Sequence, residues 1–235
     1  MNATNKKNSP YPTRPPSSVL ALPVSGSEDV YDDGVFGSPK GKGNNNCYAW
    51  AIDEYRNSGG RKLQPGNFSK RWGDRLDLTS CAALRARALA DLKGKGYAVD
   101  AAQPCRRGYY KIMGFLDPGT DHHWYKQHRH ALVKLSDRLR TVAAVARAMG
   151  VPPKQVYAAT ASPKEGDVVL VRDAKVWSHK QGFATGPMLK DACDRAITDP
   201  RRACRAYGDL DYTQYCGALC VRSRRAKHVQ QNATT

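Results

Sequence analysis

The apolar and polar positions in the middle of the chain predict helices first and short strands afterwards. Apolar side chains recur at helical spacing over residues 47–57, and the pattern stops at Gly59-Gly60, a typical helix end. Residues 79–93 carry a second and stronger helical pattern. Strands are predicted for residues 97–100, 109–116, 122–127, 176–179 and 215–221. Because these strands can pair as antiparallel neighbours, the pattern predicts an α+β fold.

A separate unit interrupts two strands that would otherwise form a hairpin. Within residues 129–172 the pattern predicts a strand over 131–135 and a helix over 139–149. A second helix is expected from Pro152-Pro153 to residue 159, and a strand over 168–171. We therefore expect a small βααβ insertion in a discontinuous domain that comprises residues 44–128 and 173–221.

The two ends of the chain differ from this core in composition. Residues 1–43 are rich in Pro, Gly and Ser and contain few apolar residues, which predicts an extended arm that takes its order from a partner. Residues 222–235 contain four basic residues and no acidic one, which predicts a basic tail. The short apolar stretch 19–24 is interrupted by Pro23, so we expect a chain made without a cleaved secretion signal.

The charge of the protein predicts an affinity for anionic polymers. The 235 residues include 38 Lys and Arg against 21 Asp and Glu, a net charge of +17. We expect weak, nonspecific binding of nucleic acid or other polyanions. No zinc-finger spacing, phosphate-binding loop or RNA-binding aromatic motif is present, and the sequence predicts no cofactor, no metal and no membrane span.

One cysteine stands where a nucleophile is expected. Cys47 follows a loop rich in Gly and Asn and begins a predicted helix, a position that lowers a thiol pKa and favours the thiolate. We expect His123, at the start of a strand, to act as its base and His179, on the following strand, to orient His123. Side chains alternate along a strand, so only one of His122 and His123 can face the cysteine, and we favour His123.

The other six cysteines allow several arrangements: Cys81, Cys105, Cys193, Cys204, Cys216 and Cys220. Three disulfides among six cysteines have 15 possible connectivities. Cys216 and Cys220 are too far apart on one extended strand to bond to each other. A zinc site of the last four cysteines and a set of free buried thiols are the alternatives.

The order of Cys47, His123 and His179 resembles that of papain-like cell-wall hydrolases of the NlpC/P60 and CHAP groups. The segments NNNCYAWA, LQPGN, DHHWYKQ and VWSHKQG are also similar to those of poorly characterised bacterial and viral proteins. The resemblance implies a papain-like fold, with helices packed on an antiparallel sheet, and hydrolysis of peptidoglycan. We take Asn46, Trp50, Trp124 and Tyr125, which lie close in sequence to Cys47 or His123, as candidate substrate-binding residues. Two features depart from the pattern of these families. The interval between the two histidines is much longer than a hairpin, and an Asn-Cys pair stands where the families usually have Asp-Cys.

Residues 129–172 resemble a LysM module, which binds polymers of N-acetylglucosamine. The match consists of TVAAVARAMGV, QVYAA and EGDVVLV, whereas Ser136-Asp-Arg-Leu139 replaces the usual Gly-Asp-Thr-Leu. Such a module would hold a hydrolase on its polymer.

Two functions from different classes follow. The first is a cysteine-dependent amidase or endopeptidase that acts on peptidoglycan or another cell-wall glycan and is carried in a phage or virus particle. The second is a structural virion protein, in the capsid, the tail or the particle interior, whose arms bind neighbouring virion proteins or DNA. A cysteine protease directed at a host protein would use the same site, and without a particle we expect the chain in the cytoplasm.

Overall fold

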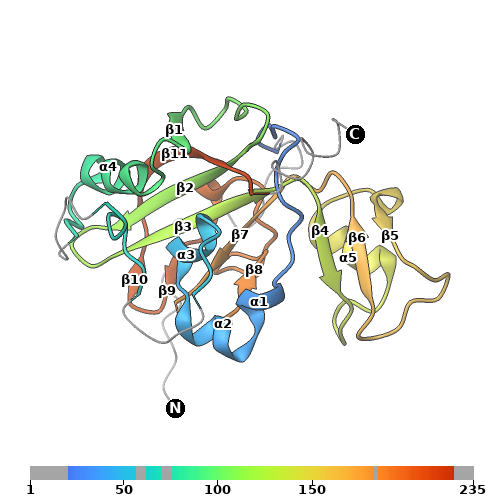
Figure 1. Ribbon diagram of the computed structural model, residues 1–235. Coiled ribbons are helices and arrows are strands. Elements are labelled where there is room, and N and C mark those ends of the chain that lie inside the picture. Colours follow the sequence, from blue (N-terminus) through green and yellow to red (C-terminus); the bar gives the residue numbers. More distant parts are fainter. Residues whose placement is uncertain (1–20, 57–61, 70–75, 183–184, 225–235) are drawn as a thin grey trace, which may run out of the picture.

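The computed structural model describes residues 21–56, 62–69, 76–182 and 185–224, and these form an α+β fold. Its centre is a six-stranded antiparallel sheet in the order β1-β11-β2-β3-β7-β8 (Figure 1). The strands are β1 (Gly96–Val99), β2 (Tyr109–Asp117), β3 (Asp121–His128), β7 (Val176–Lys180), β8 (Pro187–Met188) and β11 (Gln214–Arg222). The five strands predicted for this domain are therefore confirmed.

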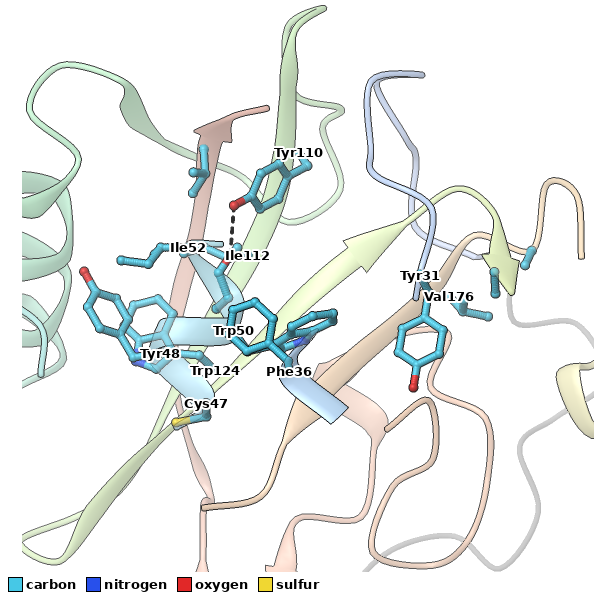
Figure 2. Packing of buried hydrophobic residues seen from close by; sticks show 14 of the residues in the cluster. Tyr31, Phe36, Cys47, Tyr48, Trp50, Ile52, Tyr110, Ile112, Trp124 and Val176 are labelled. Carbon is cyan, nitrogen blue, oxygen red and sulfur yellow. Dashed lines mark hydrogen bonds between the residues drawn. The ribbon is translucent and has the colours of Figure 1, made fainter. Parts of the chain in front are cut away.

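Two helices cover one face of this sheet. The short helix α3 (Cys47–Ala51) packs on β3 and β7, and α4 (Cys81–Asp91) packs on β11 and β2. Successive side chains of a strand point to opposite faces, so Tyr110 and Ile112 of β2 join the core beneath the helices (Figure 2). Both predicted helices exist, although α3 ends six residues before the predicted end at residue 57.

The other face of the sheet carries an irregular segment instead of helices. Met113 and Phe115 of β2 pack there in a second cluster with Ile197 and Tyr212. This segment contains the short helix η2 (Pro200–Arg202) and the two-residue strands β9 (Ala206–Tyr207) and β10 (Leu210–Asp211).

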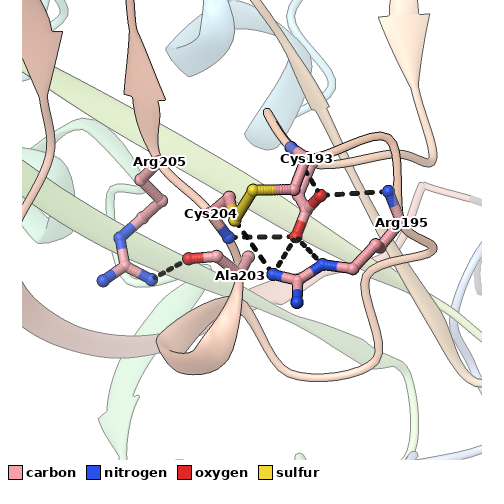
Figure 3. Close-up of a disulfide and its surroundings, with 6 residues drawn as sticks. Cys193, Arg195, Ala203, Cys204 and Arg205 are labelled. Atoms are coloured by element: carbon pink, nitrogen blue, oxygen red, sulfur yellow. Dashed lines mark hydrogen bonds and ion pairs between the residues drawn. A yellow bond between two sulfur atoms is a disulfide. The ribbon is translucent and has the colours of Figure 1, made fainter. Parts of the chain in front are cut away.

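Asp191 organises the start of this segment. Its buried carboxylate accepts hydrogen bonds from the backbone N–H groups of Cys193, Arg195 and Cys204 (Figure 3). The Arg195 guanidinium closes the loop with an ion pair to the same carboxylate at 3.1 Å. The Asp191 carboxylate and the Cys193–Cys204 disulfide thus hold together a loop with little regular secondary structure.

The insertion leaves and re-enters the sheet between paired neighbours, because His128 of β3 lies opposite Val176 of β7. It contains a separate three-stranded antiparallel sheet of β4 (Ala131–Lys134), β6 (Val168–Val171) and β5 (Val156–Tyr157), in that order. The helix α5 (Val142–Met149) is capped by Thr141 and ends at Gly150 in the left-handed conformation.

The second helix predicted for the insertion is wrong. Pro152 is extended and Pro153–Gln155 form one 3₁₀ turn, η1, after which the chain enters β5. The Gln155 carbonyl accepts the Arg172 N–H at 2.8 Å, and the β-branched Val156 pairs with Val171. In these contacts the backbone N–H and C=O groups pair with β6, whereas a helix would need them for its own hydrogen bonds. The unit is therefore not βααβ.

Part of the segment predicted as an extended arm is folded. Residues 21–43 contain α1 (Gly34–Gly37) and most of α2 (Pro39–Asn44), and they bury Leu22, Tyr31 and Phe36. Tyr31 also pairs with Ala131, the first residue of β4, and so joins the N-terminal segment to the insertion. Residues 1–20 and 225–235, the rest of the predicted arm and most of the basic tail, lie outside the described residues. None of the described helices is long and apolar enough to cross a membrane.

All seven cysteines are accounted for by three disulfides and one free thiol. The bonds join Cys81 to Cys216, Cys105 to Cys220 and Cys193 to Cys204, and Cys47 is free and buried. Cys216 and Cys220 do not bond to each other, as the strand spacing predicted. The zinc alternative is excluded because the four sulfurs that it needs are already in disulfides.

Candidate active site

The site around Cys47 is assembled from α3, β3 and the loop that precedes α4. Cys47 is the first residue of α3, and Asn46 caps the helix by accepting the Ala49 N–H at 3.0 Å. Figure 2 shows the Cys47 sulfur at the end of the helix, beside the aromatic core of Tyr48 and Trp124. The residue is 5% exposed.

His122, and not His123, lies beside the cysteine. The Cys47 Sγ is 3.9 Å from the Nδ1 of His122 and 3.6 Å from the His122 carbonyl oxygen. His122 shares its face of β3 with Trp124, which packs against Tyr48 of α3. His123 points to the opposite face and makes its contacts there, so the prediction that His123 faces Cys47 is wrong and His122 takes that place.

The residue that orients His122 is Gln64, which the sequence reasoning missed. The Oε1 of Gln64 is 2.6 Å from the Nε2 of His122. An amide oxygen only accepts hydrogen bonds, so Nε2 carries the ring proton. The lone pair of the imidazole is then on Nδ1, which faces Cys47 and is free to accept a proton from the thiol.

Buried polar groups hold the Gln64 loop in place. The Asn46 amide donates to the Leu63 carbonyl at 2.8 Å, which ties this loop to the start of α3. The carboxylate of Asp91, at the end of α4, accepts the N–H groups of Gly66 and Phe68 at 2.7 and 2.8 Å. The same carboxylate accepts the Tyr48 hydroxyl at 3.0 Å, so one buried acid joins the loop to α3. The motif LQPGN thus forms the turn that positions Gln64.

Burial favours the neutral forms of both Cys47 and His122. Burial raises the pKa of Cys47 to about 12, and the Asp121 carboxylate adds to this increase. The Lys180 ammonium and the backbone N–H groups of Tyr48 and Trp124 lower the Cys47 pKa by less. Burial also lowers the pKa of His122 to about 4. Burial therefore opposes the thiolate expected at the helix start, because the loss of water outweighs the effect of the helix end.

Lys180, the last residue of β7, interacts electrostatically with Cys47. It is fully buried, and its ammonium donates to the carbonyl oxygens of Lys42 and Gly182 at 3.0 and 2.5 Å. Burial lowers its pKa to about 8, while the neighbouring Cys47 opposes this shift. The charge of Lys180 therefore favours a negative sulfur at Cys47.

His123 and His179 form a pair of their own on the opposite face of the sheet. The His123 Nε2 is 2.8 Å from the His179 Nδ1, and the His179 Nε2 donates to the Lys190 carbonyl at 2.9 Å. The His123 ring also stacks on Tyr212, with 4.8 Å between ring centroids. The two strands pair as predicted, but the histidines serve this cluster and not Cys47.

The four candidate substrate-binding residues lie in the packed interior. Trp124 and Tyr125 are fully buried, and Asn46 and Trp50 are each 4% exposed. Asn46 acts as the helix cap, and the Trp50 indole donates to the Ser178 hydroxyl at 2.9 Å. The structure gives all four a packing or capping role and shows none of them on an open surface.

Comparisons of the chain with models of protein families, with curated proteins and with solved structures found no match.

Proposed function

We propose that the protein is a cysteine-dependent amide hydrolase with Cys47 as nucleophile, His122 as base and Gln64 as the orienting residue. The proposal rests on one observation, the chain of contacts from the Cys47 sulfur through His122 to Gln64. The order of helix, cysteine, strand and histidine matches what the papain-like resemblance implies, with His122 in place of His123. Cys47 is also the only cysteine of the seven outside a disulfide.

The geometry supports acyl transfer by general base catalysis. The His122 Nδ1 takes the thiol proton as the sulfur attacks the carbonyl carbon of the amide. The C–N bond then breaks, the imidazolium returns the proton to the leaving nitrogen, and an amine departs from an acyl-cysteine. Water that loses a proton to Nδ1 attacks the thioester, the C–S bond breaks, and Cys47 regains its proton as the carboxylic acid leaves. Gln64 keeps the ring in the required tautomer throughout.

The proposed substrate is the peptide part of peptidoglycan, reached from a phage or virus particle. The resemblance to cell-wall hydrolases and the insertion with its own three-stranded sheet support this substrate, and the insertion would hold the enzyme on the glycan. Three disulfides suit a protein that works outside a reducing cytoplasm.

The test compares two neighbouring histidines with the same substitution. Purified peptidoglycan is incubated with the full chain, and free amino groups are measured, since each cleaved amide releases one. We expect Cys47→Ala and His122→Gln to abolish the release, and His123→Gln to retain it where thermal melting shows a folded protein. Equal release by wild type and Cys47→Ala would contradict the mechanism. No release by the wild type would contradict the substrate.

A structural virion protein is the second candidate, and the burial of Cys47 favours it. A thiol that is 5% exposed and has a pKa of about 12 is typical of a cysteine in a packed core. In this case the arms would bind neighbouring subunits or DNA. Sedimentation of the full chain and of a variant without residues 1–20 and 225–235 tests it. We expect assembly by the first and not by the second, and a monomeric full chain would contradict this function.

A further inference from the structure

A cavity lies at the edge of the large sheet and is lined by basic and aromatic side chains. Its volume is about 690 Å³, within the range of small-ligand sites. Strand β1 ends at Val99, opposite Ala218 of β11, so within the described residues β11 has no strand partner on that side from Gln214 to Gly217. The cavity occupies this place. Its chemistry is carried by six of the lining residues: Arg85, Tyr97, Asp100, Arg106, Arg201 and Tyr215.

Three guanidinium groups give the cavity a positive charge. Arg85 and Arg106 are exposed, and within the described part of the chain neither forms an ion pair with a carboxylate. Arg201 is held in place by the Asp199 carboxylate at 2.7 Å. Asp100 is the only acidic residue among those that line the cavity. Guanidinium groups present planar pairs of donors that match phosphate oxygens.

Two disulfides fix the positions of these side chains. Cys81 lies one helical turn before Arg85 in α4 and is bonded to Cys216, the neighbour of Tyr215. Cys105, the neighbour of Arg106, is bonded to Cys220 on the same strand. The Arg85 side chain also lies directly over Gly217, where an added Cβ would be 3.0 Å from its Cδ. The walls are therefore covalently joined to β11, which reduces the ordering cost of binding a ligand.

Aromatic rings add a flat surface to the charge. Tyr215 is 37% exposed, and its ring packs against Phe115 with 5.3 Å between centroids. Tyr97 is half-buried, with the Arg106 guanidinium 4.9 Å from its ring centroid. Phosphate-binding guanidinium groups beside an accessible ring are the two elements that bind single-stranded nucleic acid. A polyphosphate without bases or sugars would use the charge and leave the ring unused.

We propose that this cavity binds a short stretch of single-stranded nucleic acid, with phosphates on Arg85, Arg106 and Arg201 and a base stacked on Tyr215. The site is separate from Cys47 and its function does not depend on the proposed hydrolysis. A protein with net charge +17 is expected to bind anionic polymers over much of its surface, and this cavity would be one defined binding site for them.

The test measures the anisotropy of a fluorescein-labelled eight-nucleotide oligothymidylate with the full chain. Arg85→Gln/Arg106→Gln removes two charges from the cavity and leaves the Arg201–Asp199 ion pair intact. Arg138→Gln/Arg140→Gln is the matched control, because both residues are exposed and lie in the insertion. We expect the first variant to lose at least about tenfold in affinity and the control less than about threefold. The slope of log affinity against log salt should become less steep by about 1.4 in the first variant.

Tyr215→Ala separates base stacking from charge. We expect a loss of about fivefold or more, because stacking on an aromatic side chain contributes this much or more to each base. Inorganic polyphosphate should compete poorly with the oligonucleotide. Equal losses in the two arginine variants, or an unchanged affinity of Tyr215→Ala together with effective competition by polyphosphate, would overturn the proposal. Thermal melting checks that each variant is folded, and single Arg85→Gln, which changes one exposed side chain, provides the test if the double variant is not.

Discussion

The protonation state of Cys47 gives the sharpest test of the candidate site. If burial holds the pKa near 12, the resting protein contains a neutral thiol beside a neutral imidazole and no thiolate–imidazolium pair. Alkylation by iodoacetamide requires the thiolate, so its rate reports this state directly.

The expected rate follows from the pKa. At pH 7.5 a thiol with a pKa of about 12 is ionised to about 3 parts in 100,000, against about 1 part in 10 for an ordinary cysteine with a pKa of about 8.5. This lowers the rate by about 3,000-fold. The more basic sulfur is about 40-fold more nucleophilic at a Brønsted slope of about 0.45, so the net rate is about 80-fold below that of a free cysteine. Limited access of the reagent slows it further.

The assay is mass spectrometry of the labelled protein between pH 6 and 10, without reductant. Because the other six cysteines are in disulfides, a single label is expected, and the unfolded, unreduced protein should take up one label at the ordinary rate. The rate in the folded protein should rise tenfold for each pH unit through the whole range. Lys180→Met should slow labelling and Asp121→Asn should accelerate it, since these groups lower and raise the Cys47 pKa.

A rate that levels off below about pH 9 would refute this reasoning. It would show that the thiolate forms near neutral pH and that the helix end and Lys180 outweigh burial. Labelling as fast as that of a model thiol at pH 7 would do the same.

Three further predictions concern stability. Gly114→Ala should destabilise the protein by about 2 kcal/mol, because its Cβ would lie 2.9 Å from the buried Trp124 ring. Gly43→Ala is the control, because a Cβ there would meet no atom within 4 Å. Equal effects of the two substitutions on urea unfolding would contradict this prediction. Replacing Cys81, Cys105, Cys216 and Cys220 together by Ser should cost at least about 5 kcal/mol, because it opens both nested loops, with sequence separations of 135 and 115. Replacing Cys193 and Cys204 should cost about 3 kcal/mol, because that bond closes a loop with a sequence separation of only 11; the opposite order in urea would reject the entropic argument. Burial lowers the pKa of His122, His128 and His179 to about 4, 3 and 4, so on acidification the unfolded chain binds protons before the folded protein does. The free energy of unfolding should therefore fall as the pH drops below about 6.5, by about 2 kcal/mol per histidine at pH 5. An unfolding free energy that stays constant between pH 7 and 5 would exclude neutral buried imidazoles.

Much of the fold is predictable because the hydrophobic periodicity is strong where the core forms. The strands β2, β7 and β11, the helix α4 and the position of the insertion all follow from local pattern and turn residues. The second helix of the insertion fails because a tertiary contact, the pairing of Val156 with Val171, overrides a local preference. The packing of Phe36 and Tyr31 was missed because isolated aromatic residues in a segment rich in Gly carry no periodic signal.

The candidate site is less predictable than the fold. Strand β3 is polar and aromatic on both faces, and residues 122–128 are all buried, so nothing in the sequence shows whether His122 or His123 faces α3. Gln64 lies 58 positions from His122 in a turn without secondary structure. The motif LQPGN marks that turn, but only the three-dimensional contact with Asp91 shows where it is held.

The covalent connectivity has a consequence for the life span of the protein. The bonds Cys81–Cys216 and Cys105–Cys220 both start before the insertion and end after it on β11. A protease that cuts the exposed loop 158–167 of the insertion therefore produces two fragments that remain one molecule until they are reduced. Cys47, Gln64 and His122 all lie in the first fragment. A protease that makes this one cut would thus leave the candidate site whole and attached to its sheet.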